Sequence, residues 1–354
     1  MKMGRIEDLK KKIDKEGLEA FLITRKENLY YFLNFIGEGT LLITKDKAIL
    51  FVTPLFLESA EEQCKNIEIL KLSLHIDPLK YIINEIKKIN GKIGFDELSS
   101  KSYIYFSSNL SKDNKLLNKE EIIWDMRKIK DEDEILKIKE AAKITDMGLK
   151  LALEIIKPGI TELDIKAEVI KEMMKNGAEE IAFEPIIASG RNSSFPHGGY
   201  KNRKLKKGDI VVIDIGAKYK GYCSDETRVS YVYELDNEMK KVYNIVLEAQ
   251  ELALKNIKEG IAMKEVDKKV RDFFKEKGFK DKFIHGLGHG IGINIHEPPT
   301  INPLSKDFFK KNMVVSCEPG IYIPKNYGIR IEDTILIKEK GVEILTKTSK
   351  DIEL

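Results

Sequence analysis

Two carboxylates interrupt a short apolar stretch near the middle of the chain. The segment DIVVIDIGAKYKGYCSDETR carries Asp214 inside an Ile/Val run and Asp225 after a turn signal rich in Lys, Tyr and Gly. A hairpin turn centred between Tyr219 and Lys220 would place the two aspartates directly opposite each other on one face. Opposed like charges repel and a buried unpaired carboxylate is costly, so a metal ion between them is the economical arrangement. The alternative is a twisted surface hairpin with two solvated aspartates.

A second hairpin, later in the chain, predicts the same arrangement. The strand-like runs VVSCEPG and GIRIE flank a PKN turn, and a turn centred on Lys325 places Glu318 opposite Glu332. Carboxylates are hard oxygen ligands that suit divalent cations such as Mn(II). Four of them can hold two ions if one carboxylate from each hairpin bridges the pair. Two such hairpins favour a metal site over solvated surface charges.

Histidines are concentrated around the same segments. The run HGLGHGIG contains His285 and His289, and its alternating glycines predict extended chain rather than a helix-borne pair of zinc-binding histidines. Glycine on both sides of His289 allows the backbone to approach its neighbours closely. His296 follows this run directly, and the first half carries its own histidine, His197, in the segment FPHG, so four of the five histidines fall in the predicted site region. A purely structural role is the alternative for His285 and for His197.

The second part of the chain repeats itself. The segment IKPGI, which contains Gly159, is matched by IKEGI, which contains Gly260, and the same spacing separates Gly177 from Gly278. Each block predicts a long helix, a glycine-containing turn, a second amphipathic helix and a strand-rich segment. The shared register of both glycines indicates a structural duplication, with one carboxylate hairpin in each half.

The first third predicts a small α/β domain, because short strand-like and helical segments alternate there. Strands are expected at Ala20–Thr24, Thr40–Thr44, Ala48–Val52 and Lys92–Phe95, and helices at Pro54–Lys65 and Pro78–Lys88. A highly charged segment follows Trp124, and its acidic residues are expected to open a long helix. The predicted domains are therefore residues 1–124 and 125–354.

Composition limits the partners and the compartment. The 354 residues include 61 basic and 58 acidic side chains, a near balance that does not indicate nucleic-acid binding. Three widely spaced cysteines do not form a disulfide framework, which favours the reducing cytoplasm. The charged N-terminal segment lacks the apolar core of a signal peptide, and no apolar run is long enough to span a membrane. We expect a soluble cytoplasmic protein.

Four segments together resemble a known family. DIGAKYKGYCSD, GLGHGIGINIHE, SCEPGIY and GIRIED are similar to the motifs of the metallopeptidases with the pita-bread fold, in particular Xaa-Pro dipeptidase (prolidase) and aminopeptidase P. NLYYFLNF resembles the asparagine-and-aromatic segment of the N-terminal region of this family. The resemblance implies an α+β fold: a C-terminal pita-bread domain with an internal pseudo-two-fold repeat, preceded by a smaller α/β, creatinase/prolidase-like domain. It also implies a homodimer, since relatives are commonly dimers.

The same likeness assigns expected roles to individual residues. The metal ligands correspond to Asp214, Asp225, His289, Glu318 and Glu332. Positions around these ligands and the substrate correspond to His197, His285, His296 and Arg330. Glu318 is the expected proton acceptor and donor, His197 and His296 are expected hydrogen-bond donors, and Arg330 is expected to pair with a carboxylate of substrate or protein. The family attribution is two manganese or cobalt ions per chain, with zinc and iron(II) as alternatives.

The expected reaction is metal-dependent hydrolysis of the peptide bond before proline in small peptides. Two neighbouring ions would make a hydroxide available near neutral pH. Xaa-Pro dipeptidase is the leading interpretation, and aminopeptidase P, which acts on longer peptides, is the alternative. The complete set of five ligands disfavours a non-catalytic binding protein and a metal-independent hydrolase of the creatinase type. The sequence leaves open the preferred residue before proline and the length of the substrate.

Overall fold

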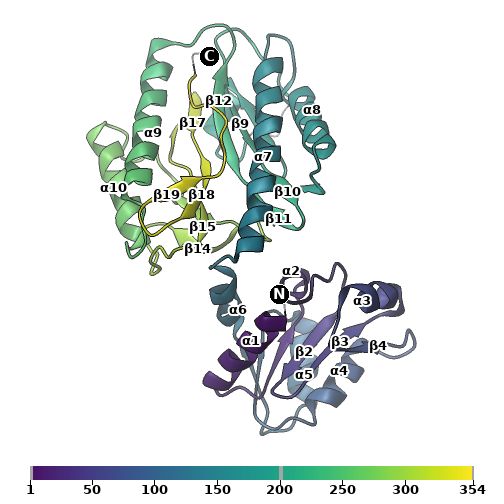
Figure 1. The fold of residues 1–354 in the computed structure, drawn as a ribbon. Coiled ribbons are helices and arrows are strands. Elements are labelled where there is room, and N and C mark those ends of the chain that lie inside the picture. Colours follow the sequence, from purple (N-terminus) through teal and green to yellow (C-terminus); the bar gives the residue numbers. More distant parts are fainter. Residues whose placement is uncertain (1–2, 199–201, 353–354) are drawn as a thin grey trace. The chain divides into compact units, whose positions relative to one another are not determined.

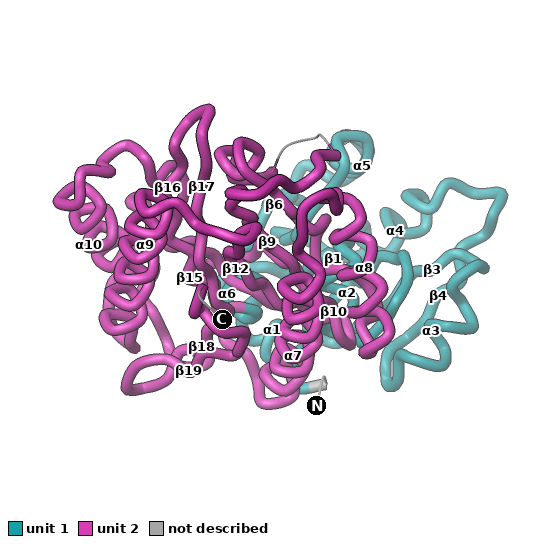
Figure 2. The backbone as a smooth tube through the Cα atoms, turned by 90° about the horizontal axis from the view of Figure 1, so that it is seen from above, with its two compact units in different colours: residues 1–127 teal, residues 128–354 magenta. Residues whose placement is uncertain are grey.

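The computed structural model describes residues 3–198 and 202–352 of the chain. Contacts divide the chain into two compact units, Met1–Arg127 and Lys128–Leu354 (Figure 2). The boundary expected after Trp124 falls inside helix α6 (Glu120–Arg127), the last helix of the first unit. Among the described residues, no helix is long and apolar enough to cross a membrane.

The first unit is built on one mixed sheet of six strands in the order β4-β3-β2-β1-β5-β6 (Figure 1). The strands are β1 (Ala20–Ile23), β2 (Thr40–Thr44), β3 (Ala48–Val52), β4 (Glu68–Lys71), β5 (Lys92–Phe95) and β6 (Lys115–Asn118). The helices are α1 (Met3–Lys15), α2 (Lys26–Leu33), α3 (Leu57–Gln63), α4 (Pro78–Ile86), α5 (Ser100–Asn109) and α6. The central strand β1 is buried along its whole length, which explains its purely apolar sequence. The predicted small α/β fold is confirmed.

Two pairs of long helices frame the second unit, one pair from each repeat. The helices are α7 (Glu132–Ile155), α8 (Glu162–Lys175), α9 (Asn237–Asn256) and α10 (Met263–Glu276). The predicted acidic opening of α7 is confirmed, since Asp131 and Glu134 form a capping box at its first turn. The pairs α7/α8 and α9/α10 lie on opposite sides of the strands (Figure 1).

The strands between these helices form short antiparallel sheets. The first repeat contributes β7 (Glu180–Ile181), β8 (Ile186–Ser189), β9 (Ile210–Ile215), β10 (Ala217–Tyr219), β11 (Tyr222–Cys223) and β12 (Glu226–Tyr231). The second contributes β13 (Gly288–Gly290), β14 (Glu297–Ile301), β15 (Val314–Cys317), β16 (Gly320–Ile323), β17 (Tyr327–Arg330), β18 (Asp333–Ile337) and β19 (Val342–Ile344). A separate apolar core lies on each side, under α7/α8 and under α9/α10.

The internal duplication extends to the backbone conformation. Gly159 and Gly260 have φ angles of 88° and 85°, and Gly177 and Gly278 have φ angles of 99° and 89°. These left-handed values suit glycine, which has no Cβ to clash. Gly159 donates its amide to a carbonyl of its own half, as Gly260 does in the other half. The repeat predicted from the glycine spacing is therefore present in the fold.

The two hairpins differ in how well their register was predicted. Around Lys325 the expected register is confirmed, because Gly320 pairs with Arg330 and Cys317 pairs with Asp333, which leaves Glu318 opposite Glu332. The register expected for the first hairpin is wrong.

In the first hairpin Asp214 pairs with Thr227, not with Asp225. The turn residues are Lys220 and Gly221, whose φ angles of 44° and 74° are both positive. A two-residue turn of this kind suits a hairpin and needs glycine, so it moves the centre of the hairpin along the chain. The partner of Asp214 is therefore two positions further along the chain than expected. Because alternate residues of a strand point to the same face, Asp225 still lies on the same face as Thr227.

The repeat also predicts a stability difference between two helix N-termini. The Thr161 side chain caps α8 in a capping box with Asp164, whereas Ala262 occupies the same position before α10 and makes no side-chain cap. Thr161→Ala should lower the free energy of unfolding by about 1 kcal/mol. Ala262→Ser should raise it by up to about 1 kcal/mol, since Glu265 can complete a capping box. Urea-induced unfolding measures both, and an unchanged stability of Thr161→Ala would contradict this account.

Candidate metal centre

One row of side chains crosses the boundary between the two repeats. Asp214 on β9 pairs with Thr227 on β12, and Thr227 forms an isolated backbone bridge with Glu332. Glu332 in turn lies opposite Glu318 in the register of the second hairpin. Because antiparallel neighbours in such a row point to the same face, carboxylates from distant parts of the sequence are brought together.

All nine residues predicted for the site line a single cavity of about 290 Å³. They are Asp214, Asp225, His289, Glu318, Glu332, His197, His285, His296 and Arg330. The wall also includes the apolar side chains of Phe183, Ile186 and Pro196, and the polar side chains of Thr300 and Asn302. The cavity therefore combines convergent carboxylates and histidines with a small apolar surface, as small-molecule sites commonly do.

Three of the predicted ligands form the tightest group. One atom each of Asp225, His289 and Glu332 lies within 4.8 Å of the other two. Glu318 is close to this group, with its Oε1 atom 3.4 Å from His289 Nε2. Asp225 Oδ2 lies 3.6 Å from the same nitrogen. Asp214 lines the cavity but is outside the tightest group, because one of its oxygens is turned toward Arg330.

The carboxylates present oxygens that the protein leaves without hydrogen bonds. Within the described residues, Asp214 Oδ1, Asp225 Oδ1 and Glu332 Oε1 are buried and have no hydrogen-bond partner. A buried acceptor without a partner costs free energy, and an unsatisfied group in a native protein requires an explanation. Divalent cations take such oxygens as ligands, together with imidazole in the case of Mn(II), Co(II), Fe(II) or Zn(II). The donor set therefore fits the divalent metal ions implied by the resemblance.

The protonation of the central carboxylates and of His289 is set by burial. Burial, reinforced by the neighbouring carboxylates and first by Glu332, raises the pKa of Asp225 well above its usual value. Burial and the charges of Glu318 and Asp214 raise the pKa of Glu332 in the same way. Burial lowers the pKa of His289, which favours the neutral imidazole that binds metals. A cation would reverse the effect on the carboxylates by favouring their ionised forms.

Hydrogen bonds fix the orientation of the His289 ring. His289 Nδ1 lies 3.1 Å from the carbonyl oxygen of Gly290, which can only accept, so Nδ1 carries the proton. The lone pair of Nε2 then faces Asp225 and Glu318, the arrangement expected of a metal-binding histidine. The predicted close approach of this strand is confirmed, since a Cβ on Gly288 would lie 2.1 Å from the Ser316 carbonyl oxygen.

Arg330 connects Asp214 to the remaining polar wall. Its guanidinium forms an ion pair with Asp214 and donates to Tyr322 Oη at 2.8 Å. Tyr322 Oη lies 3.0 Å from His285 Nε2, and His285 Nδ1 lies 2.8 Å from the Gly286 carbonyl oxygen. Since that carbonyl fixes the proton on Nδ1, Tyr322 donates to Nε2. Arg330 thus pairs with a carboxylate of the protein, one of the two partners expected from the sequence.

The two other histidines lie toward solvent. His197 and His296 line the cavity and are both exposed. The His296 ring centroid lies 4.3 Å from that of His289, so His296 is next to the tightest group. These positions allow both side chains to contact a molecule that enters the cavity.

Sequence reasoning missed several side chains of this site. Tyr322 was detectable, because it lies two positions from Gly320, the strand partner of Arg330. Thr227 would have appeared opposite Asp214 had the turn at Gly221 been recognised. Phe183 and Ile186 of the first repeat also line the cavity, and no pattern in the sequence indicates that they do so.

Comparison with known proteins identifies the family. The sequence profile of Metallopeptidase family M24 matches residues 136–339, more than half of the chain. The chain belongs to metallopeptidase family M24. The profile of the Creatinase/Prolidase N-terminal domain matches residues 5–129 of this M24 peptidase. The predicted fold class, a pita-bread domain preceded by a creatinase/prolidase-like domain, is confirmed.

Relatives of this M24 peptidase match over nearly the whole chain. It is 39% identical to a Xaa-Pro dipeptidase of Pyrococcus furiosus, over 98% of this chain and 99% of the relative. The structure of a Xaa-Pro dipeptidase from Bacillus anthracis superposes with a TM-score of 0.94 at 36% identity, covering 99% of each chain. An X-Pro aminopeptidase from Thermotoga maritima superposes with a TM-score of 0.89 at 38% identity, covering 98% of each chain.

The raised pKa of Glu332 predicts the behaviour of metal-free protein. A carboxyl whose pKa rises on folding stabilises the fold below the pKa of the unfolded chain, near 4, and this contribution is lost as pH rises toward the folded pKa. Without metal, Glu332→Gln should therefore become progressively more stable than the parent as pH rises above about 4.

Thermal unfolding in chelator across pH 4–8 measures this difference. Glu234→Gln is the matched control, because it removes the same charge from a side chain that is 70% exposed. A stability difference between parent and Glu332→Gln that stays constant over this range would contradict the electrostatic account.

Proposed function

We propose that this M24 peptidase is a Xaa-Pro dipeptidase that holds two divalent metal ions in the cavity. The observation that carries the proposal is the group of buried carboxylate oxygens without hydrogen bonds beside His289. The dipeptidase relatives from Pyrococcus furiosus and Bacillus anthracis, similar over their full lengths, support the substrate class. Small proline-containing peptides are the proposed substrates.

The proposed ligands are Asp214, Asp225, His289, Glu318 and Glu332. Four carboxylates and one neutral imidazole suit Mn(II) or Co(II), and Zn(II) or Fe(II) would also accept this set. Each half of the duplicated domain supplies carboxylates, so the centre would be completed only when both halves are folded. The separation of Asp214 from the tightest group follows from its ion pair with Arg330.

When bound, divalent ions supply Lewis acidity and lower the pKa of water toward neutrality. Glu318 is the proposed proton acceptor and donor, because its carboxylate is 17% exposed and faces the cavity beside His289. Ser316 Oγ, 3.1 Å from Glu318 Oε1, supports one oxygen of this carboxylate. Glu318 would take a proton from the attacking water and return it to the leaving nitrogen.

His197 and His296 are the proposed donors to the substrate. Both are exposed at the cavity, so either can donate a hydrogen bond to the developing oxyanion or to the carboxyl-terminal part of the peptide. His285 is held by Tyr322, and Arg330 is held by Asp214, so we assign these two residues to orienting the wall.

The apolar wall suits a proline ring. The peptide bond before proline is a tertiary amide without an N–H group, so a site for it needs ring-shaped apolar space and no acceptor at that nitrogen. Phe183, Ile186 and Pro196 provide apolar surface on the same cavity as the carboxylates. We infer that this surface receives the proline ring.

Aminopeptidase P activity is the second candidate. The X-Pro aminopeptidase from Thermotoga maritima is 38% identical to this chain, about as similar as the dipeptidase relatives. The two activities share the bond that is cleaved and differ in whether the cavity accepts residues after proline. We also infer a homodimer in the cytoplasm, and the three buried cysteines, which form no disulfide among the described residues, are consistent with that reducing compartment.

A substrate panel distinguishes these activities. With Mn(II) added, we expect cleavage of Ala-Pro and little or no cleavage of Ala-Pro-Ala or Met-Ala-Ser. Product release measured by mass spectrometry answers the question directly. Cleavage of Ala-Pro-Ala as fast as Ala-Pro would move the assignment to aminopeptidase P, and turnover of only the methionyl peptide would refute both.

Replacing one proposed ligand should remove activity without unfolding the protein. Asp225→Asn should lower hydrolysis of Ala-Pro below detection and reduce the bound metal by at least one ion per chain. The loss of one anionic ligand accounts for both changes. Asp133→Asn is the matched control, since the Asp133 side chain is 66% exposed and outside the cavity. Circular dichroism checks the fold, and full activity of Asp225→Asn would contradict the metallopeptidase mechanism.

A further inference from the structure

The two halves of the second unit meet along a seam made of two similar triplets. The first half contributes Asp225-Glu226-Thr227 and the second contributes Glu332-Asp333-Thr334, each an acid, an acid and a threonine. The backbone bridge between Thr227 and Glu332 lies at this seam, and the Glu332 amide donates to the Thr227 carbonyl at 3.2 Å. One proposed metal ligand begins each triplet.

Each threonine of the seam holds the acidic residue of the other half. Thr227 Oγ1 donates to Glu332 Oε2 at 2.6 Å. Thr334 Oγ1 donates to the Asp225 carbonyl oxygen at 2.7 Å and accepts from the Asp225 amide at 3.0 Å. Both threonines are fully buried, so neither hydroxyl can exchange its partner for water. The contacts are reciprocal across the seam.

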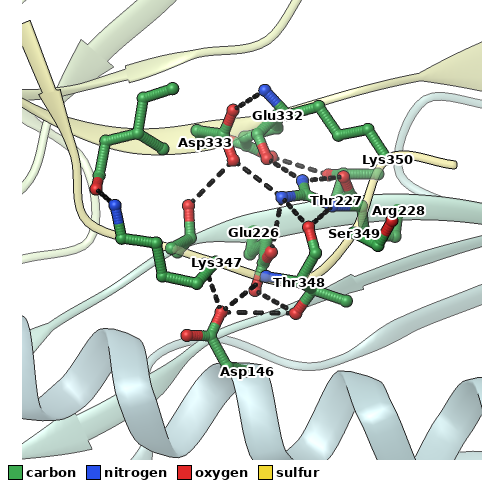
Figure 3. A network of polar contacts seen from close by, with 12 residues as sticks. Asp146, Glu226, Thr227, Arg228, Glu332, Asp333, Lys347, Thr348, Ser349 and Lys350 are labelled. Carbon is green, nitrogen blue, oxygen red and sulfur yellow. Dashed lines mark hydrogen bonds and ion pairs between the residues drawn. The ribbon is translucent and has the colours of Figure 1, made fainter.

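The opposite face of the seam is closed by the buried side chain of Arg228 (Figure 3). Its Nη1 atom donates to the carbonyl oxygens of Thr227 at 3.0 Å and Glu332 at 2.6 Å, one from each half. Its Nη2 atom lies 2.7 Å from Glu226 Oε1 and 2.8 Å from Asp333 Oδ1, the middle acids of the two triplets. A single guanidinium therefore ties both strands together through backbone and side chain.

The C-terminal segment completes this cluster. Thr348 accepts from Arg228 through its carbonyl oxygen at 2.8 Å, and Lys350 forms an ion pair with Asp333 (Figure 3). Arg228 and Lys350 both pair with Asp333, which lowers the cost of burying these charges. Burial raises the pKa of Glu226 well above its usual value, so the neutral carboxyl is favoured beside Arg228.

The seam is consequently fixed on this face by Arg228 and the C-terminal segment. On its cavity-facing side lie the two threonines, and Thr227 Oγ1 also accepts a hydrogen bond from Arg330 Nε at 3.1 Å.

We propose that Thr227 and Thr334 are positioning residues that set the separation of Asp225 and Glu332 across the seam. This inference rests on the proposed metal centre, because the separation matters only if both carboxylates share bound ions. Neither threonine is among the described residues that line the cavity, so each acts through the carboxylate residue that it holds. Removing one hydroxyl should make the position of Asp225 relative to Glu332 less well defined. All five proposed ligand residues would still be present in the variant.

The direct test replaces Thr334 with valine and with serine. Thr334→Val keeps the shape of the side chain and removes the hydroxyl, whereas Thr334→Ser keeps the hydroxyl. We expect Thr334→Val to bind Mn(II) about 10–100-fold more weakly than the parent, the usual range for residues that support metal ligands. Thr334→Ser should recover most of the affinity. Calorimetric titration of metal-stripped protein with Mn(II) alone measures both.

Thr145→Val is the matched control. Thr145 is fully buried and its hydroxyl bonds to Ser224 Oγ at 2.6 Å and to the Ala217 amide at 2.9 Å, all within the first half. It should lose stability without a comparable loss of Mn(II) affinity. An equal loss of affinity in Thr145→Val and Thr334→Val would overturn the proposal, because any buried hydroxyl would then serve.

The outcomes separate this inference from the proposed function. If the parent protein binds no Mn(II), the metal centre itself is refuted. If the parent binds Mn(II) and a folded Thr334→Val binds it equally well, only the positioning role is overturned. Should Thr334→Val not fold, Thr227→Val and Thr227→Ser carry the same test through the direct hydrogen bond to Glu332, with the same expected ratio.

Discussion

The structure of the second unit depends on one electrostatic constraint, the burial of several carboxylates in one cavity. Asp225 and Glu332 are both buried. The ionised form of each is disfavoured first by the loss of solvent and then by the neighbouring carboxylates. Among the described residues that line the cavity, only Arg330 brings a permanent positive charge, and it is paired with Asp214. Divalent cations would relieve the repulsion between the carboxylates and would bind the oxygens that have no hydrogen-bond partner. The same feature that destabilises the metal-free site would therefore give the loaded site its affinity.

The duplicated fold supplies the rigidity that this constraint requires. Each half presents its carboxylates from a hairpin backed by two long helices, and glycines allow the strand of His289 to approach its neighbours closely. The seam between the halves is fixed on one face by Arg228. On the other face it is fixed by hydrogen bonds from the hydroxyl of one threonine in each half to an acidic residue of the other half. The proposed ligands come from both halves, so their separations depend on how firmly the two halves are held together. The many hydrogen bonds at the seam meet this requirement.

Much of this arrangement was predictable from the sequence, because residue type and periodicity carry it. The carboxylate pairs, the histidines and the glycine repeat indicate most of the cavity residues through their chemistry and spacing, whereas Arg330 was expected from the family resemblance. The register of the first hairpin was not predicted, since it depends on which two residues take positive φ angles in the turn. Thr334 was missed because its role comes from a tertiary contact with Asp225 across the two halves, which local patterns do not encode.

The central claim is that the two halves share a pair of metal ions, and anomalous diffraction at the manganese edge tests it most directly. Crystals grown with Mn(II) should show two anomalous peaks in the cavity, located between the carboxylates of Asp225 and Glu332 and next to His289 Nε2. A cavity without anomalous peaks in crystals saturated with Mn(II), or peaks confined to surface carboxylates, would contradict the account.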